Sequence, residues 1–119
     1  MELDRVVAVR VSSLGDIARL ASTLASRMFL MPVYRFRGSS GWVYALQTIY
    51  KDYYKYYGVP VVYYYVAGEE EPGRPVRYIL ARADETGERV EVSDRTRTGW
   101  IAIPVINLEE KPGYMPDDI

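Results

Sequence analysis

The alternation of apolar and polar residues predicts one strand and then one helix at the start of the chain. Residues 4–12 (DRVVAVRVS) are rich in valine, with one at every second position, which is typical of a strand. From Leu14 to Leu30 the apolar residues instead recur three or four positions apart, with polar residues between them. Ser13 stands just before this segment and favours a helix start there. The pattern therefore predicts a strand over 4–12 and a surface helix over 14–30.

The fold prediction depends most on the segment 42–57. It follows a short strand, predicted over 33–37, and the flexible sequence GSSG at 38–41. On a helical wheel its largest apolar residues fall on one stripe, which consists of Trp42, Leu46, Ile49, Tyr53 and Tyr57. Gly58 then supplies a helix stop. This spacing predicts a second helix, and a pair of strands is the alternative for so aromatic a segment.

Period-two patterns predict strands in the rest of the chain, over 59–66, 76–83, 88–94 and 100–108. Pro104 indicates that the last strand lies at a sheet edge or contains a bulge, because proline cannot donate to the ladder. The sequence GEEEPGRP at 68–75 predicts a mobile loop.

The predicted order is β-α-β-α-β-β-β-β. It indicates an α+β fold, a mostly antiparallel sheet with two helices packed on one face. Residues 1–108 are predicted to form this single domain. Residues 109–119 (EEKPGYMPDDI) are acidic and contain two prolines, so we expect a flexible tail.

Composition excludes the commonest catalytic and metal chemistry. The chain has no His and no Cys, so it lacks the commonest general base, the thiolate nucleophile and the usual zinc ligands. The only tight acidic cluster, Glu69-Glu70-Glu71, is interpreted as a solvated loop. Neither GxxxxGK[ST] nor GxGxxG occurs. We therefore expect a protein that is not an enzyme and that holds no metal or cofactor.

Other features of composition indicate habitat and location. One Asn, one Gln and seven Pro are typical of a hyperthermophile, because few thermolabile residues and stiff loops favour stability at high temperature. No segment resembles a signal peptide, and no apolar run reaches the roughly 18 residues of a membrane span. A cytoplasmic location without a membrane partner is expected.

Tyrosine and positive charge are concentrated in the same half of the chain. Ten of the twelve tyrosines lie between Tyr34 and Tyr65. Through Tyr65 there are eight Lys/Arg against four Asp/Glu, and from Val66 onward seven against twelve. Aromatic faces beside cations suit single-stranded nucleic acid, whose bases stack and whose phosphates need positive charge. This combination predicts sequence-tolerant binding of single-stranded DNA, with RNA as a further possibility.

Two groups of residues are the candidates for this binding. The candidates for base stacking are Trp42, Tyr44, Tyr50, Tyr54 and Trp100, and those for phosphate contact are Arg35, Arg37, Lys51, Lys55, Arg95 and Arg97. Tyr44 falls on the polar side of the predicted second helix, between the two lysines. The arginines at 35 and 37 share a strand face, and RTRTGW at 95–100 again spaces two arginines before an aromatic ring.

Each feature also has an alternative interpretation. Arg35 and Arg37 can form ion pairs with the acidic half of the chain. The aromatic surface can be buried between subunits of a homo-oligomer, a dimer or a tetramer, since Tyr, Trp and Arg are enriched at such interfaces. A non-enzymatic scaffold is therefore the second hypothesis for function.

Size, the predicted β-α-β-α opening, and the segment GSSGWVYALQTIYKDYYKYYGVPVVYYY at 38–65 carry a resemblance to one family. Across roughly residues 4–108 the chain resembles the archaeal single-stranded-DNA-binding proteins called ThermoDBP, especially the shorter related proteins that share their N-terminal domain. The resemblance implies a homo-oligomer that is not an OB fold and that binds single strands in an aromatic cleft flanked by basic residues. Longer members add a C-terminal extension for assembly, which the short acidic tail here does not match.

Overall fold

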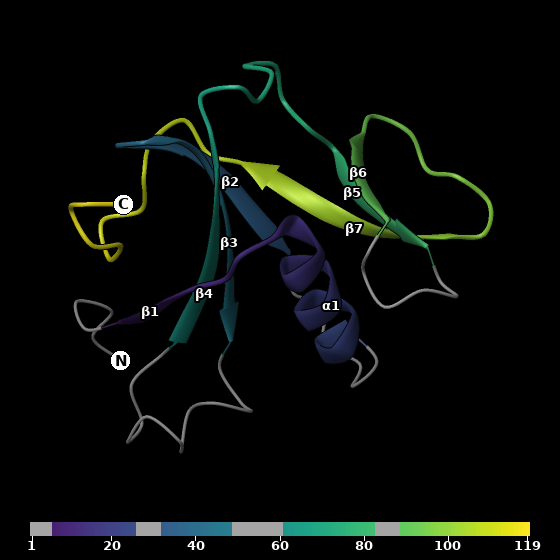
Figure 1. The fold of residues 1–119 in the computed structure, drawn as a ribbon, viewed down its shortest axis with the longest axis horizontal. Coiled ribbons are helices and arrows are strands. Elements are labelled where there is room, and N and C mark those ends of the chain that lie inside the picture. The colour runs from purple at the N-terminus through teal and green to yellow at the C-terminus, as the bar shows by residue number, and fades with distance from the viewer. Residues whose placement is uncertain (1–5, 26–31, 49–60, 83–88) are drawn as a thin grey trace.

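The computed structural model describes residues 6–25, 32–48, 61–82 and 89–119. These residues form a small, mostly sheet domain with a single helix and seven strands (Figure 1). In chain order the elements are β1 (Val7–Arg10), α1 (Leu14–Ala25), β2 (Val33–Gly38), β3 (Gly41–Thr48), β4 (Val61–Gly68), β5 (Tyr78–Arg82), β6 (Val90–Ser93) and β7 (Trp100–Asn107).

The helix α1 begins where the sequence predicts it. The Ser13 Oγ accepts a hydrogen bond of 3.1 Å from the Asp16 amide, which satisfies one of the free N–H groups of the first turn. Ile17, Ala18 and Ala21 are buried on the sheet, so the predicted apolar stripe is the packed face. The part of the prediction that covers residues 26–30 lies outside the described residues.

All seven strands join one sheet in the order β1-β4-β3-β2-β7-β5-β6. The β1–β4 and β2–β7 pairs are parallel, and the other four pairs are antiparallel. β7 lies inside the sheet, so the edge position predicted from Pro104 is wrong. Pro104 is tolerated where β7 changes partner, because residues 100–104 pair with β5 and residues 105–107 pair with β2.

The helix predicted over 42–57 is wrong, and with it the two-helix β-α-β-α order. Residues 41–48 form β3, which pairs with β2 on one side and β4 on the other. The same residues also satisfy a period of two, since Tyr44 and Leu46 are buried on one face and Val43 and Ala45 on the other. Packing on both faces and hydrogen bonds along both edges outweigh the helical spacing. Residues 49–57 lie outside the described residues.

Glycine permits the close approach of the β3 start to the end of β4. Gly41 has φ 110°, and a Cβ there would lie 2.3 Å from the carbonyl carbon of Gly68. Any other residue would be strained and would clash with backbone. Glycine thus fixes the start of β3 beside the residues that follow β4.

The two faces of the sheet are covered by different segments. We call the face under α1 the helix face and the opposite one the far face. On the far face Met115 and Ile119 are buried against Phe36, Val43 and Val62. Figure 1 shows the C-terminal segment, in yellow, beside the β1–β4 end of the sheet. The segment 109–119, predicted to be flexible, therefore packs on the sheet through its few apolar residues.

Candidate arginine–tryptophan sites

Arginine and tryptophan side chains meet at two places in the sheet. Arg35 pairs with Tyr44 across β2 and β3, and Arg37 pairs with Trp42. Tyr44 is part of the core beneath α1, so these four side chains share the helix face, because alternate residues of a strand point the same way. They form the Trp42 cluster.

The second place is the Trp100 cluster, made of Trp100, Arg82 and Arg97. Arg82 pairs with Trp100 across β5 and β7, one residue on from Ala81, which belongs to the core under α1. The alternation therefore puts Arg82 and Trp100 on the far face. The two clusters lie on opposite faces of the sheet.

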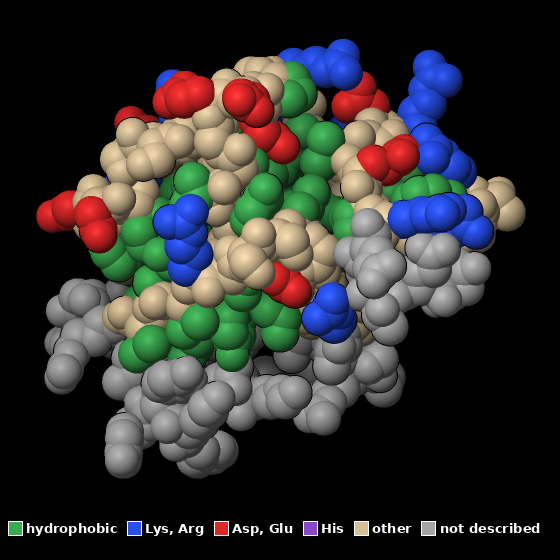
Figure 2. Space-filling model, in the orientation of Figure 1, with side chains coloured by type: hydrophobic (Ala, Val, Ile, Leu, Met, Phe, Trp, Pro, Cys, Tyr) green, Lys and Arg blue, Asp and Glu red, His purple; other side chains and the backbone are tan. Residues whose placement is uncertain are grey.

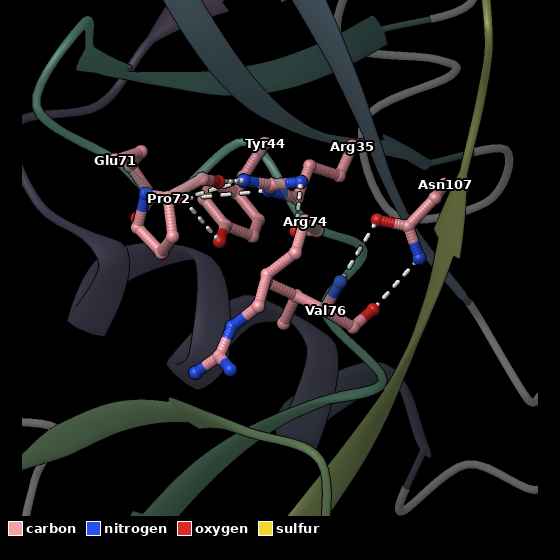
Figure 3. A network of polar contacts seen from close by, with 7 residues as sticks. All are labelled: Arg35, Tyr44, Glu71, Pro72, Arg74, Val76 and Asn107. Atoms are coloured by element: carbon pink, nitrogen blue, oxygen red, sulfur yellow. Dashed lines mark hydrogen bonds and ion pairs between the residues drawn. The ribbon is translucent and has the colours of Figure 1, made fainter.

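In the Trp42 cluster the Arg35 guanidinium is enclosed between aromatic rings and a loop. It lies 4.1 Å from the Trp42 ring centroid and 5.8 Å from that of Tyr44. Residues 68–75, which we call the acidic loop, fold over it (Figure 3). Arg35 is only 1% exposed.

Every side of the Arg35 guanidinium has an acceptor. Nε and Nη2 donate to the Glu71 carboxylate at 3.4 and 3.1 Å, Nη1 donates to the Arg74 carbonyl at 3.2 Å, and Nη2 donates also to the Pro72 carbonyl. The Tyr44 hydroxyl donates to the same carboxylate at 2.8 Å (Figure 3). A buried charge is stable only when it is paired and hydrogen-bonded in this way.

These contacts change the interpretation of Arg35 and Tyr44. Both were candidates for contact with nucleic acid, and both are buried with their polar atoms already bonded within the protein. Burial first, and then the Glu71 carboxylate, raise the pKa of the Tyr44 hydroxyl above its ordinary value, so this group stays protonated. The alternative interpretation, that Arg35 and Arg37 form ion pairs with the acidic half of the chain, is confirmed for both, since Arg35 pairs with Glu71 and Arg37 with Glu69.

The acidic loop is held at its far end as well. The Asn107 amide on β7 accepts from the Val76 N–H at 3.1 Å and donates to the Val76 carbonyl at 2.7 Å (Figure 3). The Asn107 side chain thus makes the two hydrogen bonds that the backbone of a neighbouring strand would make with Val76. The loop predicted to be mobile and solvated is therefore fixed by side chains from β2, β3 and β7.

A groove of about 290 Å³ runs beside Trp42. Its lining residues are Arg35, Trp42, Gly73, Pro75, Asn107, Leu108 and Glu109. The guanidinium in this groove is saturated by internal acceptors, and Glu109 adds negative charge at the rim. The groove offers an aromatic and apolar wall. Arg37 is not part of its lining, and its guanidinium lies 5.8 Å from the Trp42 ring centroid.

The Trp100 cluster is open by comparison. The guanidinium carbons of Arg82 and Arg97 lie 5.5 and 5.1 Å from the Trp100 ring centroid. Arg97 also pairs with Glu91 at 2.6 Å, with the two side chains 51% and 41% exposed. Figure 2 shows Lys and Arg side chains gathered over the β5–β7 end of the molecule, together with acidic ones.

The segment 94–99 builds this cluster by crossing the sheet. Glu91 lies on β6 and Trp100 on β7, with β5 between them. Because Arg97 contacts both, the segment crosses β5 on the far face, where Leu80 is buried. Arg95, in the same segment, is exposed and has no ion-pair partner among the described residues. Gly99, with φ 82°, makes the turn into β7.

The structure thus groups the predicted residues into two sets. Arg35, Arg37, Trp42 and Tyr44 lie together on the helix face, and Arg97 lies against Trp100 on the far face with Arg95 near it in sequence. Tyr50, Lys51, Tyr54 and Lys55 lie outside the described residues. Sequence reasoning missed Arg82, Glu69 and Glu71 as partners. No local signal pairs Arg82 with a ring eighteen positions away, because only strand register joins them.

Comparison of the chain with protein-family models, with curated proteins and with solved structures found no match. The resemblance to the ThermoDBP-related family therefore stays a prediction. Within the described part of the chain, no helix has the length and apolar character that a membrane span requires. The residues that the structure describes also contain no group of three potential metal ligands placed to hold an ion, Glu69 to Glu71 included.

Proposed function

We propose that this protein binds single-stranded nucleic acid, DNA in the first instance, without strong sequence preference. The observation that carries the proposal is a half-buried Trp100 with two guanidinium groups against its ring, on the face that α1 does not cover. Base stacking needs an accessible aromatic ring, and phosphate contact needs cations beside it. The proposal requires no catalytic residue and no cofactor, and it includes the cytoplasmic location expected from the sequence.

The electrostatics of the Trp100 cluster support exchange of partners. The Arg97–Glu91 pair is about half exposed, and exposed pairs contribute only about 0.2–1 kcal/mol. A phosphate can therefore replace Glu91 as the partner of Arg97 with only a small loss of free energy. Arg95, exposed on the same segment, adds a second positive charge close by. Binding of this kind weakens as salt rises, because each phosphate contact releases counterions.

Trp100→Ala should weaken binding of a labelled oligo-dT, which fluorescence anisotropy measures at two salt concentrations. Wild type should bind at low salt and release at high salt. The variant should bind about 5- to 150-fold more weakly, which corresponds to the loss of one base stack worth about 1–3 kcal/mol.

The matched control is Ile101→Ala, which removes an exposed apolar side chain from the next position of β7, on the opposite face. Its affinity should stay near that of wild type. No binding at low salt, binding that ignores salt, or equal losses in the two variants would each contradict the proposal.

A homo-oligomeric scaffold, a dimer or a tetramer, is the second candidate. Ile106 and Ile101 on β7 are 42% and 39% exposed, and large exposed apolar residues are common at subunit interfaces. A stable oligomer in light scattering, together with no shift of any oligonucleotide, would favour this function over nucleic-acid binding.

A further inference from the structure

Two ion pairs join β2 to the acidic loop, and they differ in how far their side chains are exposed. Arg35 and Glu71 are 1% and 16% exposed, whereas Arg37 and Glu69 are 53% and 61% exposed. Both arginines come from β2 and both carboxylates from the same loop. One pair is therefore part of the interior, and the other stands at its solvent edge.

The buried pair anchors the loop while the exposed pair does not. Glu71 receives bonds from Arg35 and Tyr44, and Arg35 also holds the carbonyls of Pro72 and Arg74. Movement of residues 71–74 would therefore leave a buried charge without its partners. Glu69 precedes this anchor and follows Gly68, whose φ is 92°. Its carboxylate can leave Arg37 with the rest of the loop in place.

Arg37 stands where a nucleotide would need a cation. Its guanidinium lies 5.8 Å from the Trp42 ring centroid, and Trp42 is partly exposed and lines the apolar groove. A guanidinium binds a phosphate with the same planar geometry that it uses for a carboxylate. In this structure the Glu69 carboxylate is the group that Arg37 binds.

We propose that Arg37 and Trp42 form a second subsite, for one phosphate and its adjoining base, and that Glu69 masks the cation of this subsite in the free protein. The inference rests on the proposed function. It assigns the Trp42 cluster a binding role in which Arg35 and Tyr44 hold the site in place. It also means that a single-stranded nucleic acid competes with the Glu69 carboxylate for Arg37.

The test compares Glu69→Gln with Glu70→Gln by the same oligo-dT titration at low salt. The two variants remove the same charge from adjacent positions of one loop, but Glu70 forms no ion pair among the described residues. Unmasking Arg37 should make Glu69→Gln bind about two- to fivefold more tightly than Glu70→Gln, the range that one exposed ion pair supports. In an Arg37→Gln background the two should bind equally. Equal affinities with Arg37 present would overturn the inference.

A second readout separates this inference from the proposed function. In Trp100→Phe, Trp42 is the one tryptophan left, because the chain has two. Quenching of its fluorescence by inorganic polyphosphate should occur at lower concentration in Glu69→Gln than in Glu70→Gln. If wild type binds no oligonucleotide, the proposed function fails, and this measurement still decides whether Glu69 masks an anion site. Identical quenching curves would reject the masking.

Discussion

The Trp42 and Trp100 clusters each contain one tryptophan and two arginines, and they differ in how the arginine that pairs most closely with the ring is solvated. Each has a tryptophan with two guanidinium groups within 6 Å of its ring centroid, and in each an arginine pairs with a glutamate. At Trp42 the central arginine is enclosed and hydrogen-bonded to the acidic loop. At Trp100 the paired arginine is about half exposed. The same residue type is therefore structural at Arg35, which is buried, and open to exchange of partners at Arg97, which is exposed.

Desolvation explains the difference. A buried guanidinium has given up its water, so removal of a partner leaves a charge that nothing compensates and costs about 3–5 kcal/mol. An exposed pair keeps most of its water and can exchange partners, because it contributes little. Stability should thus respond to changes at Arg35, and binding should respond to changes at Trp100 and Arg97.

The largest expected effect is on stability, from Arg35→Met. The variant leaves the Glu71 carboxylate and two carbonyls of the acidic loop without their donor, so the free energy of unfolding should fall by about 3–5 kcal/mol. Denaturant unfolding monitored by circular dichroism measures it. Arg97→Met, the matched change in the exposed cluster, should lower it by less than about 1 kcal/mol. Similar losses in the two variants would erase the distinction between the clusters.

Tyr44→Phe should have an intermediate effect, because it removes one hydrogen bond to a charged acceptor. The expected loss at neutral pH is about 1.5–3 kcal/mol of unfolding free energy. Burial and Glu71 raise the folded-state pKa of Tyr44, so its contribution is complete below the ordinary pKa of 10.0 and declines as pH rises above it. Unfolding curves at pH 7 and above pH 10 should therefore show the difference between wild type and variant shrinking. A difference that grows with pH would contradict the buried, protonated hydroxyl.

The smallest effect is expected from Arg97→Gln, which should act on binding and hardly on folding. One phosphate contact is lost, so the slope of log affinity against log salt should decrease by about 1 for oligo-dT. The free energy of unfolding should change by less than about 0.5 kcal/mol, as for other surface substitutions. An unchanged salt slope would remove Arg97 from the proposed binding face.

Local pattern predicted most elements, and its one large error has a clear cause. The structure confirms the predicted helix start at Leu14 and has a strand within each of the six predicted segments or overlapping it, since capping and alternation are local signals. Residues 42–48 fit both a period of 3.6 and a period of two, and only the partners on either side decide between them. Gly41, packed against Gly68, and the pairing of Tyr44 with Tyr65 fix the strand. Neither contact is visible in the segment itself.

The sequence by itself determined that aromatic and basic residues are concentrated together, that His and Cys chemistry is absent, and where six of the seven strands lie. Tertiary structure alone decided which arginines keep their water. Glu71 of the acidic loop lies thirty-six positions after Arg35 in the sequence, and the loop buries the Arg35 guanidinium. Arg37, two residues further along β2, stays at the surface. The pattern of strand residues sets which face a side chain takes, but its solvation depends on what the rest of the chain lays over that face.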